Sequence, residues 1–223
     1  MDRVELKTKA KEMIKDNKWF IWKPIIIYSA IIFAITFIAT ILDQAFGLTK
    51  TEIVEVVNGI SYTRTTGTIS SIIGIIIGIV SCAVAIGYAY YILSFIRGKK
   101  LEMKDIIDFA KKNWVKAVLV SLIVGIIIAV GTVLLVIPGI IAEVGLVFYQ
   151  ETCADNLELG YMDTVKKAWA ITKGHKMDIF LLQLSFIGWA LLAVLTLGIL
   201  YIWLMPYMVV TLTLAYEKLK AAN

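Results

Sequence analysis

The sequence predicts an all-helical integral membrane protein with six transmembrane helices. The 223 residues are 60% hydrophobic and only 17% charged, whereas a soluble domain carries about 25% charged residues. The apolar residues are gathered in long runs, as they are in membrane spans. The Lys and Arg residues are shared very unevenly between the connections of these runs, which is typical of a polytopic membrane protein.

Six apolar segments follow one another along the chain. A helix rises about 1.5 Å per residue and the hydrocarbon core is about 30 Å thick, so a span needs roughly 20 residues. The last three segments are short for this, and we expect them to cross as tightly packed hairpins. The predicted spans are 25–42, 70–96, 117–137, 140–154, 179–195 and 199–215, with breaks at Pro138-Gly139 and Thr196-Leu197-Gly198.

The basic residues predict the orientation of the spans. Of the 22 Lys and Arg residues, only Lys50 and Arg64 fall in the connection 43–68 between the first two spans. The other 20 lie in the N-terminal segment, in the connections 97–116 and 155–178, or in the C-terminal tail. With six spans all of these are on one side, and basic residues favour the cytoplasm, so both termini are expected there. A charged, helix-periodic stretch precedes the first span, which argues against a cleavable signal peptide.

A charged amphipathic segment precedes each pair of spans. We therefore expect a unit that is repeated three times, a cytoplasmic amphipathic helix followed by a helical hairpin, with the helices at residues 6–18, 103–113 and 161–173. These segments end in similar runs, Lys15-Asp16-Asn17-Lys18-Trp19, Lys111-Lys112-Asn113-Trp114 and Lys173-Gly174-His175-Lys176.

The chain is accordingly predicted to be a single membrane domain over residues 1–223. It would consist of an N-terminal cytoplasmic helix, a first hairpin with its external loop, and two further units of interfacial helix and hairpin. The corresponding ranges are 1–23, 24–96 with the loop 43–68, 97–154, and 155–223.

Two interpretations of the charged segments remain open. Their apolar stripes would lie against lipid or the helix bundle while their lysines contact anionic headgroups, or they are ordinary connectors with a solvated face. The candidate headgroup contacts are Lys11, Lys15, Lys111, Lys112, Lys166 and Lys173.

The external loop is predicted to contain a small β-hairpin. β-Branched residues on both sides flank Asn58-Gly59, and Asn-Gly favours a type I′ turn because both central residues need a positive φ. A lone two-stranded hairpin is marginally stable in water, so this one would rest on the membrane, the bundle or a partner.

Several runs of residues resemble a known family. The run Ser185-Phe186-Ile187-Gly188-Trp189 is the most specific, and Pro206-Tyr207-Met208, Val136-Ile137-Pro138-Gly139 and Glu5-Leu6-Lys7 accompany it. With these runs the chain resembles the bacterial membrane-protein family catalogued as domain of unknown function 975. The resemblance covers nearly the whole chain apart from the external loop. It implies a multi-span protein of the bacterial cytoplasmic membrane and no established activity.

Residues that carry chemistry are sparse. The chain has one histidine and two cysteines without metal-ligand spacing, and it has no P-loop, HExxH motif, nucleophile elbow or dinucleotide loop. We therefore expect no enzymatic activity, no metal, no cofactor and no nucleic-acid partner. Gly74 and Gly78 form a stripe of small residues with Ser70 and Cys82, which favours close helix packing within the chain or between copies.

Four positions are candidates for an intramembrane polar seam or a hinge. Glu143 is an acidic residue inside a predicted span, where a carboxyl is costly and often functional. Pro206 removes an N–H from the sixth span and predicts a kink, and Gln183 and Tyr207 lie in the same hairpin. Hydrogen bonds between helices explain these polar residues as well as a pocket does.

Two functions are compatible with this pattern. The first is a non-enzymatic membrane protein that acts through contacts with lipid, a membrane-protein partner or another copy of itself, in envelope support, regulation or protection. The alternative is a small transporter or channel subunit with a polar seam near Glu143 and Pro206. A dry, packed centre would count against the transporter, and a co-purified anionic lipid would support the first function.

Overall fold

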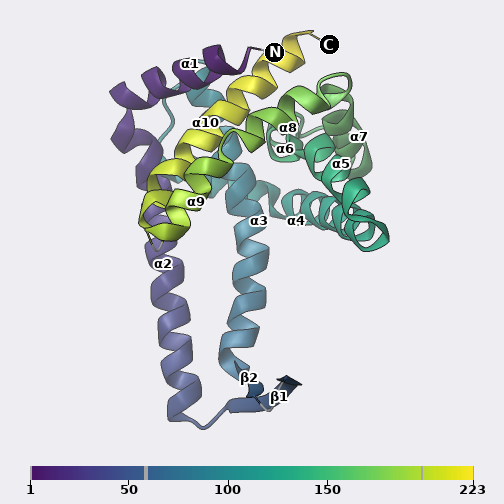
Figure 1. The fold of residues 1–223 in the computed structure, drawn as a ribbon. Coiled ribbons are helices and arrows are strands. Elements are labelled where there is room, and N and C mark those ends of the chain that lie inside the picture. The colour runs from purple at the N-terminus through teal and green to yellow at the C-terminus, as the bar shows by residue number, and fades with distance from the viewer. Residues whose placement is uncertain (1, 58–59, 197, 223) are drawn as a thin grey trace. The chain divides into compact units, whose positions relative to one another are not determined.

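The computed structural model describes residues 2–57, 60–196 and 198–222, and their regular secondary structure is helical apart from two strands (Figure 1). The helices are α1 (Arg3–Asp16), α2 (Lys18–Ala45), α3 (Thr68–Ile96), α4 (Met103–Leu134), α5 (Val136–Leu146), α6 (Tyr149–Asp155), α7 (Tyr161–Thr172), α8 (Lys176–Leu184), α9 (Ile187–Leu195) and α10 (Ile199–Ala222), and the strands are β1 (Thr49–Val57) and β2 (Ile60–Gly67).

Six helical segments in the described part of the chain are long and apolar enough to cross a membrane. They confirm the prediction of a multi-pass membrane protein, while its sidedness stays a prediction. The segments are Lys18–Ala45, Thr68–Ile96, Met103–Leu134, Val136–Asp155, Lys176–Leu195 and Leu200–Ala222.

The chain forms two compact units, Met1–Pro24 with Cys82–Asn223 and Ile25–Ser81. The smaller unit contains most of α2, the first part of α3, and the sheet between them. Its strands pair antiparallel, with Thr49 opposite Gly67, which confirms the predicted β-hairpin. The predicted turn at Asn58-Gly59 lies outside the described residues.

Asp43 closes the connection between α2 and α3. This residue is 1% exposed, and its carboxylate accepts hydrogen bonds from the backbone N–H groups of Ile69 and Ser70, both at 2.8 Å. The Ser70 hydroxyl donates a further bond at 2.5 Å. The N–H groups in the first turn of a helix lack a partner within the helix, so Asp43 acts as the cap of α3. Gly67 passes so close that an added Cβ would lie 2.0 Å from the carboxylate.

The core of the larger unit gathers around α10. The side chains of Leu214 and Tyr216 are buried there, and the ring of Phe148 meets that of Tyr216 edge-on with centroids 5.8 Å apart. Helices α1, α7 and α9 all contact α10. Many large apolar side chains on the spans are exposed, which is expected where lipid covers them.

The three charged segments are helical, as predicted, and a similar backbone conformation follows each of them. Asn17 has φ −131° and ψ 32°, Asn113 has φ −116° and ψ 15°, and His175 has φ −120° and ψ 11°. At Asn113 this produces a kink inside α4. The side-chain amides of Asn17 and Asn113 both donate to the carbonyl four residues earlier, at 3.2 and 2.9 Å. This local similarity supports the predicted repeat, which otherwise stays a prediction.

Pro24 lies inside α2, where it has no N–H to donate to the carbonyl of Phe20. The hydroxyl of Tyr91 on α3 donates to this carbonyl at 3.1 Å, and Tyr88 donates to the carbonyl of Ile21 at 3.2 Å. The rings of Phe20 and Tyr91 also stack, with centroids 4.5 Å apart. The Tyr91 hydroxyl therefore replaces the donor that the proline lacks, as groups on neighbouring helices do in membrane proteins.

We expect Tyr91→Phe to lower the free energy of unfolding by about 1–2 kcal/mol, because the Phe20 carbonyl loses its donor while the ring contact remains. Thermal unfolding in detergent measures this change. Tyr201→Phe is the control, because the side chain of Tyr201 is 51% exposed. A Tm that is equal in the two variants would show that Pro24 does not depend on this hydrogen bond.

The turn between the third and fourth spans lies earlier than predicted. Helix α4 ends at Leu134, Leu135 has an extended backbone, and Pro138 and Gly139 lie within the first turn of α5. Proline is tolerated there because N–H groups in the first turn have no acceptor within the helix. A Cβ added to Gly139 would lie 2.8 Å from the Cα of Thr132, so α4 and α5 are in very close contact.

The fourth and fifth spans each consist of two helices. Helices α5 and α6 are separated at residues 147–148, and α8 and α9 at Ser185 and Phe186. The predicted break before the sixth span is confirmed at Gly198, whose φ of +86° is in the left-handed region. Leu197 lies outside the described residues. Pro206 is inside α10 as expected, and the kink stays a prediction.

Candidate lipid-contact site

The charged helices α1 and α7 pack their apolar stripes against protein. On α1, Leu6, Ala10 and Ile14 are buried, and the helix contacts α10. On α7, Val165 and Ala168 are buried, and the helix contacts α4, α5, α6 and α10. Of the two surfaces left open by the sequence, lipid and bundle, the stripes therefore contact the bundle. The opposite faces are the ones that remain available for headgroups.

All six predicted headgroup contacts have exposed side chains, namely Lys11, Lys15, Lys111, Lys112, Lys166 and Lys173. The Nζ of Lys166 lies 3.8 Å from a carboxylate oxygen of Asp163. The Nζ of Lys11 lies 5.8 Å from the ring centroid of Tyr207. The ion pair of Lys166 is exposed on both sides and stabilises the protein little, so it competes weakly with a phosphate group.

Lys7 fixes α1 to the break between α8 and α9. Its ammonium group donates to the carbonyl of Ser185 at 3.2 Å and lies 4.3 Å from the ring centroid of Phe186. Partial burial lowers the pKa of Lys7, and neighbouring basic side chains of α1 lower it further. The first two residues of the Ser-Phe-Ile-Gly-Trp run are thus in contact with the ammonium group of Lys7 on α1.

A network of charges joins the ends of α3, α6 and α10. Arg97 donates two hydrogen bonds to Asp155, at 2.7 and 2.9 Å, and pairs with Glu217 at 2.6 Å. Asp155 also accepts hydrogen bonds from the Tyr216 hydroxyl, at 3.1 Å, and from the Lys220 ammonium group. The hydrogen bond to Asp155 is the main cause that raises the pKa of Arg97. Bidentate, charge-assisted bonds of this kind hold helix ends in a fixed geometry.

The four candidate seam or hinge residues lie in different surroundings. Pro206 and Tyr207 are buried in α10, Gln183 is half-buried in α8, and Glu143 is exposed on α5. None of the four lines the cavity beside Lys116 or the smaller one beside Phe180. The Thr211 hydroxyl, in the same hairpin, donates to the carbonyl of Tyr207 at 2.7 Å, a local bond within α10.

A buried carboxyl that the sequence analysis missed belongs to Glu151 on α6. It is 7% exposed and accepts a hydrogen bond from the Thr213 hydroxyl on α10 at 3.3 Å. The adjacent Thr152 hydroxyl is buried without a hydrogen-bond partner among the described residues. Glu151 lies three residues from both Phe148 and Ala154, which are buried, so its place in an apolar stripe is the signal that could have revealed it.

Gly74 and Gly78 on α3 have open surroundings in the described structure, because a Cβ added at either would meet no atom within 4 Å. Their four-residue spacing places them on one face of α3, but it does not determine which helix packs against that face. The role of this stripe in packing, within the chain or between copies, stays a prediction. Close approach occurs instead at Gly87, where an added Cβ would lie 2.9 Å from the carbonyl oxygen of Ile106.

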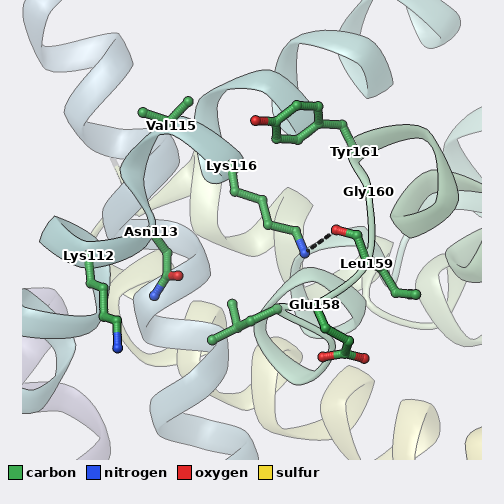
Figure 2. Close-up of a pocket in the computed structure, with 9 residues that line it drawn as sticks. Lys112, Asn113, Val115, Lys116, Glu158, Leu159, Gly160 and Tyr161 are labelled. Carbon is green, nitrogen blue, oxygen red and sulfur yellow. Dashed lines mark hydrogen bonds between the residues drawn. The ribbon is translucent and has the colours of Figure 1, made fainter.

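A cavity of about 480 Å³ lies beside the kink of α4 (Figure 2). The Lys116 ammonium group donates to the carbonyls of Asn156 and Leu159, at 2.7 and 2.8 Å, and so holds the connection between α6 and α7. The lining residues are Lys112, Asn113, Val115, Lys116, Leu157, Glu158, Leu159, Gly160 and Tyr161. Among residues 2–57, 60–196 and 198–222, no group of three or more His, Cys, Asp or Glu could hold a metal ion.

The C-terminal part of the chain matches a family model. The match is to the family described as protein of unknown function (DUF975). Residues 126–223 match DUF975. This confirms the predicted resemblance over the runs that begin at Val136, Ser185 and Pro206, while Glu5-Leu6-Lys7 precedes the matched range. No curated protein and no solved structure matches the chain.

The DUF975 match includes α5 to α10 and therefore most of the buried polar residues. Glu151, Thr152 and Thr213 all lie within it. Two of the sites combine the DUF975 region with earlier residues, since Lys7 contacts Ser185 and Arg97 contacts Asp155. The cavity is also composite, because Lys112 and Lys116 precede the DUF975 match and Glu158 lies inside it.

Proposed function

We propose that the chain is a non-enzymatic protein of the bacterial cytoplasmic membrane that acts through contacts with anionic lipid headgroups. The observation that carries this proposal is the arrangement of α1 and α7, whose apolar stripes are buried against protein while their lysines are exposed. An amphipathic helix that is already docked by its apolar face presents its basic face in a fixed direction. With both termini in the cytoplasm, this face would meet the negatively charged inner leaflet.

The transporter alternative has weaker support. The proposed polar seam relied on Glu143 and Pro206. Glu143 is exposed and Pro206 is buried, so they do not share one environment. Neither residue lines the cavity beside Lys116 or the one beside Phe180. Glu151 and Thr213 are the polar pair that would favour it, because a buried carboxyl within a span is a frequent feature of carriers. A lipid-contact function needs no such pair, and it uses residues that are already accessible.

Retention of anionic lipid tests the proposal. Native mass spectrometry of the full chain, extracted from mixed phosphatidylglycerol and phosphatidylcholine bilayers, should show preferential retention of phosphatidylglycerol. Each basic residue near an anionic surface contributes about 1 kcal/mol, so replacing Lys11, Lys15, Lys111, Lys112, Lys166 and Lys173 by glutamine should abolish this preference.

The matched control replaces the same six lysines by arginine, which keeps every positive charge and should keep the preference. Equal retention of phosphatidylglycerol by the wild type and the glutamine variant would refute the proposal. A partner protein that co-purifies with both variants would instead favour action through protein contacts.

A further inference from the structure

We propose that the cavity beside the α4 kink binds a phospholipid headgroup that carries both a phosphate and an ammonium group, as phosphoethanolamine does. This inference rests on the proposed lipid-contact function and adds to it a site for a second, zwitterionic class of lipid. The cavity has a volume of about 480 Å³, which is adequate for such a headgroup.

The position of the cavity along α4 corresponds to the headgroup level of a bilayer. Lys116 is the last charged residue of α4, and residues 117–134 contain none. The helix therefore passes from charged to uncharged, predominantly apolar sequence where the cavity lies. Lysines at such a boundary occupy the interface between water and hydrocarbon.

One wall of the cavity is held in place before any ligand binds. The Lys116 ammonium group bonds to the carbonyls of Asn156 and Leu159. The Lys167 ammonium group bonds to the side-chain oxygen of Asn156 at 2.5 Å, and Asn156 itself is buried. Because this connection is already fixed, binding would cost little ordering of the chain.

The two charges offered by the lining are complementary to a zwitterion. Lys112 comes from α4 and Glu158 from the connection between α6 and α7, and both side chains are labelled at the cavity in Figure 2. Both are exposed, and neither forms an ion pair within the part of the chain that the structure describes. Lys112 would bind the phosphate and Glu158 the ammonium group through charge-assisted hydrogen bonds.

Glu158 is the residue that would select the headgroup. A carboxylate binds an ammonium group through a charge-assisted hydrogen bond, binds the uncharged glycerol hydroxyls of phosphatidylglycerol more weakly, and receives no hydrogen bond from a trimethylated choline. Val115, Leu157 and Tyr161 are exposed apolar side chains on the same cavity, where the glycerol and upper acyl carbons would lie. These features favour a lipid over a free phosphorylated amine.

The test compares lipid retention by the full-length protein in bilayers that contain phosphatidylethanolamine, phosphatidylglycerol and phosphatidylcholine with identical acyl chains. Native mass spectrometry should show at least one retained phosphatidylethanolamine per chain. Glu158→Gln should reduce the preference for phosphatidylethanolamine over phosphatidylcholine about 5-fold, and Lys112→Gln should reduce retention of phosphatidylethanolamine by a similar factor. Lys100→Gln is the control, because Lys100 is an exposed lysine that neither lines the cavity nor belongs to the six proposed headgroup contacts.

An unchanged lipid preference in Glu158→Gln would overturn the assignment. Displacement of the retained lipid by millimolar phosphoethanolamine would also overturn it, in favour of a soluble ligand. The outcome is separable from that of the proposed function. Loss of phosphatidylglycerol in the six-lysine variant, with no effect of Glu158→Gln, would leave the function standing and remove the site. The reverse pattern would keep the site and remove the anionic-lipid function.

Discussion

Replacing Asp155 by asparagine should destabilise the larger unit by roughly 2–4 kcal/mol, somewhat less than the loss of a partner from a fully buried ion pair. The Asp155 side chain is only 10% exposed and binds Arg97 and Lys220. Without its charge, two cations lose their common partner and Arg97 keeps only Glu217. Thermal unfolding in detergent should show a clearly lower Tm, because Asp155 joins helix ends that are far apart in the sequence.

Asp163→Asn is the matched control for this substitution. Asp163 also pairs with a lysine, Lys166, but both side chains are well exposed, at 65% and 72%. Its loss should therefore change the free energy of unfolding by less than about 1 kcal/mol. If the two substitutions lowered the Tm equally, the Asp155 network would be no more than a surface ion pair.

Gly139→Ala should destabilise the hairpin of α4 and α5 by about 1–3 kcal/mol, the range for overpacking of a close contact. The added Cβ would lie 2.3 Å from the Thr132 hydroxyl oxygen and 2.8 Å from the Thr132 Cα. A hydroxyl can rotate away, but the Cα belongs to the backbone of α4. The two helices must therefore move apart, and the same unfolding experiment should report a lower Tm.

Gly125→Ala in α4 gives a control that is expected to have the opposite sign. A Cβ at Gly125 would meet no atom within 4 Å. Alanine is favoured over glycine in a helix interior by up to about 1 kcal/mol, so the Tm should stay the same or rise. A Gly139→Ala variant that unfolds at the wild-type temperature would contradict the close contact between α4 and α5.

The spans could be predicted from the sequence because long apolar runs determine them almost alone. Their interruptions could not. The prediction placed the turn of the second hairpin at Pro138-Gly139, the residues with the strongest turn preference, whereas the extended residue is Leu135. Proline is also favoured in the first turn of a helix, and glycine is also favoured where two helices are in close contact. Only the position of the partner helix determines whether these residues form a turn or lie within a helix.

The candidate site was predictable only where it depends on local pattern. The exposed lysines of the charged helices followed from helical spacing. Lys7 with Ser185 and Arg97 with Asp155 are 178 and 58 residues apart in the chain, so no local pattern reveals them. Glu151 was passed over because it stands among polar neighbours at the end of an apolar run, whereas Glu143, the more conspicuous carboxyl, is exposed.

The hydrogen bonds of Asp43 join α2 to α3 independently of the residues that lie between Leu48 and Gly67. Asp43 bonds to the first turn of α3, and its backbone carbonyl accepts a hydrogen bond from the N–H of Leu48 at 2.8 Å. The strands Thr49–Val57 and Ile60–Gly67 lie within the segment that these contacts close. We therefore expect the hairpin to tolerate insertion of an epitope tag, with the two helices left undisturbed.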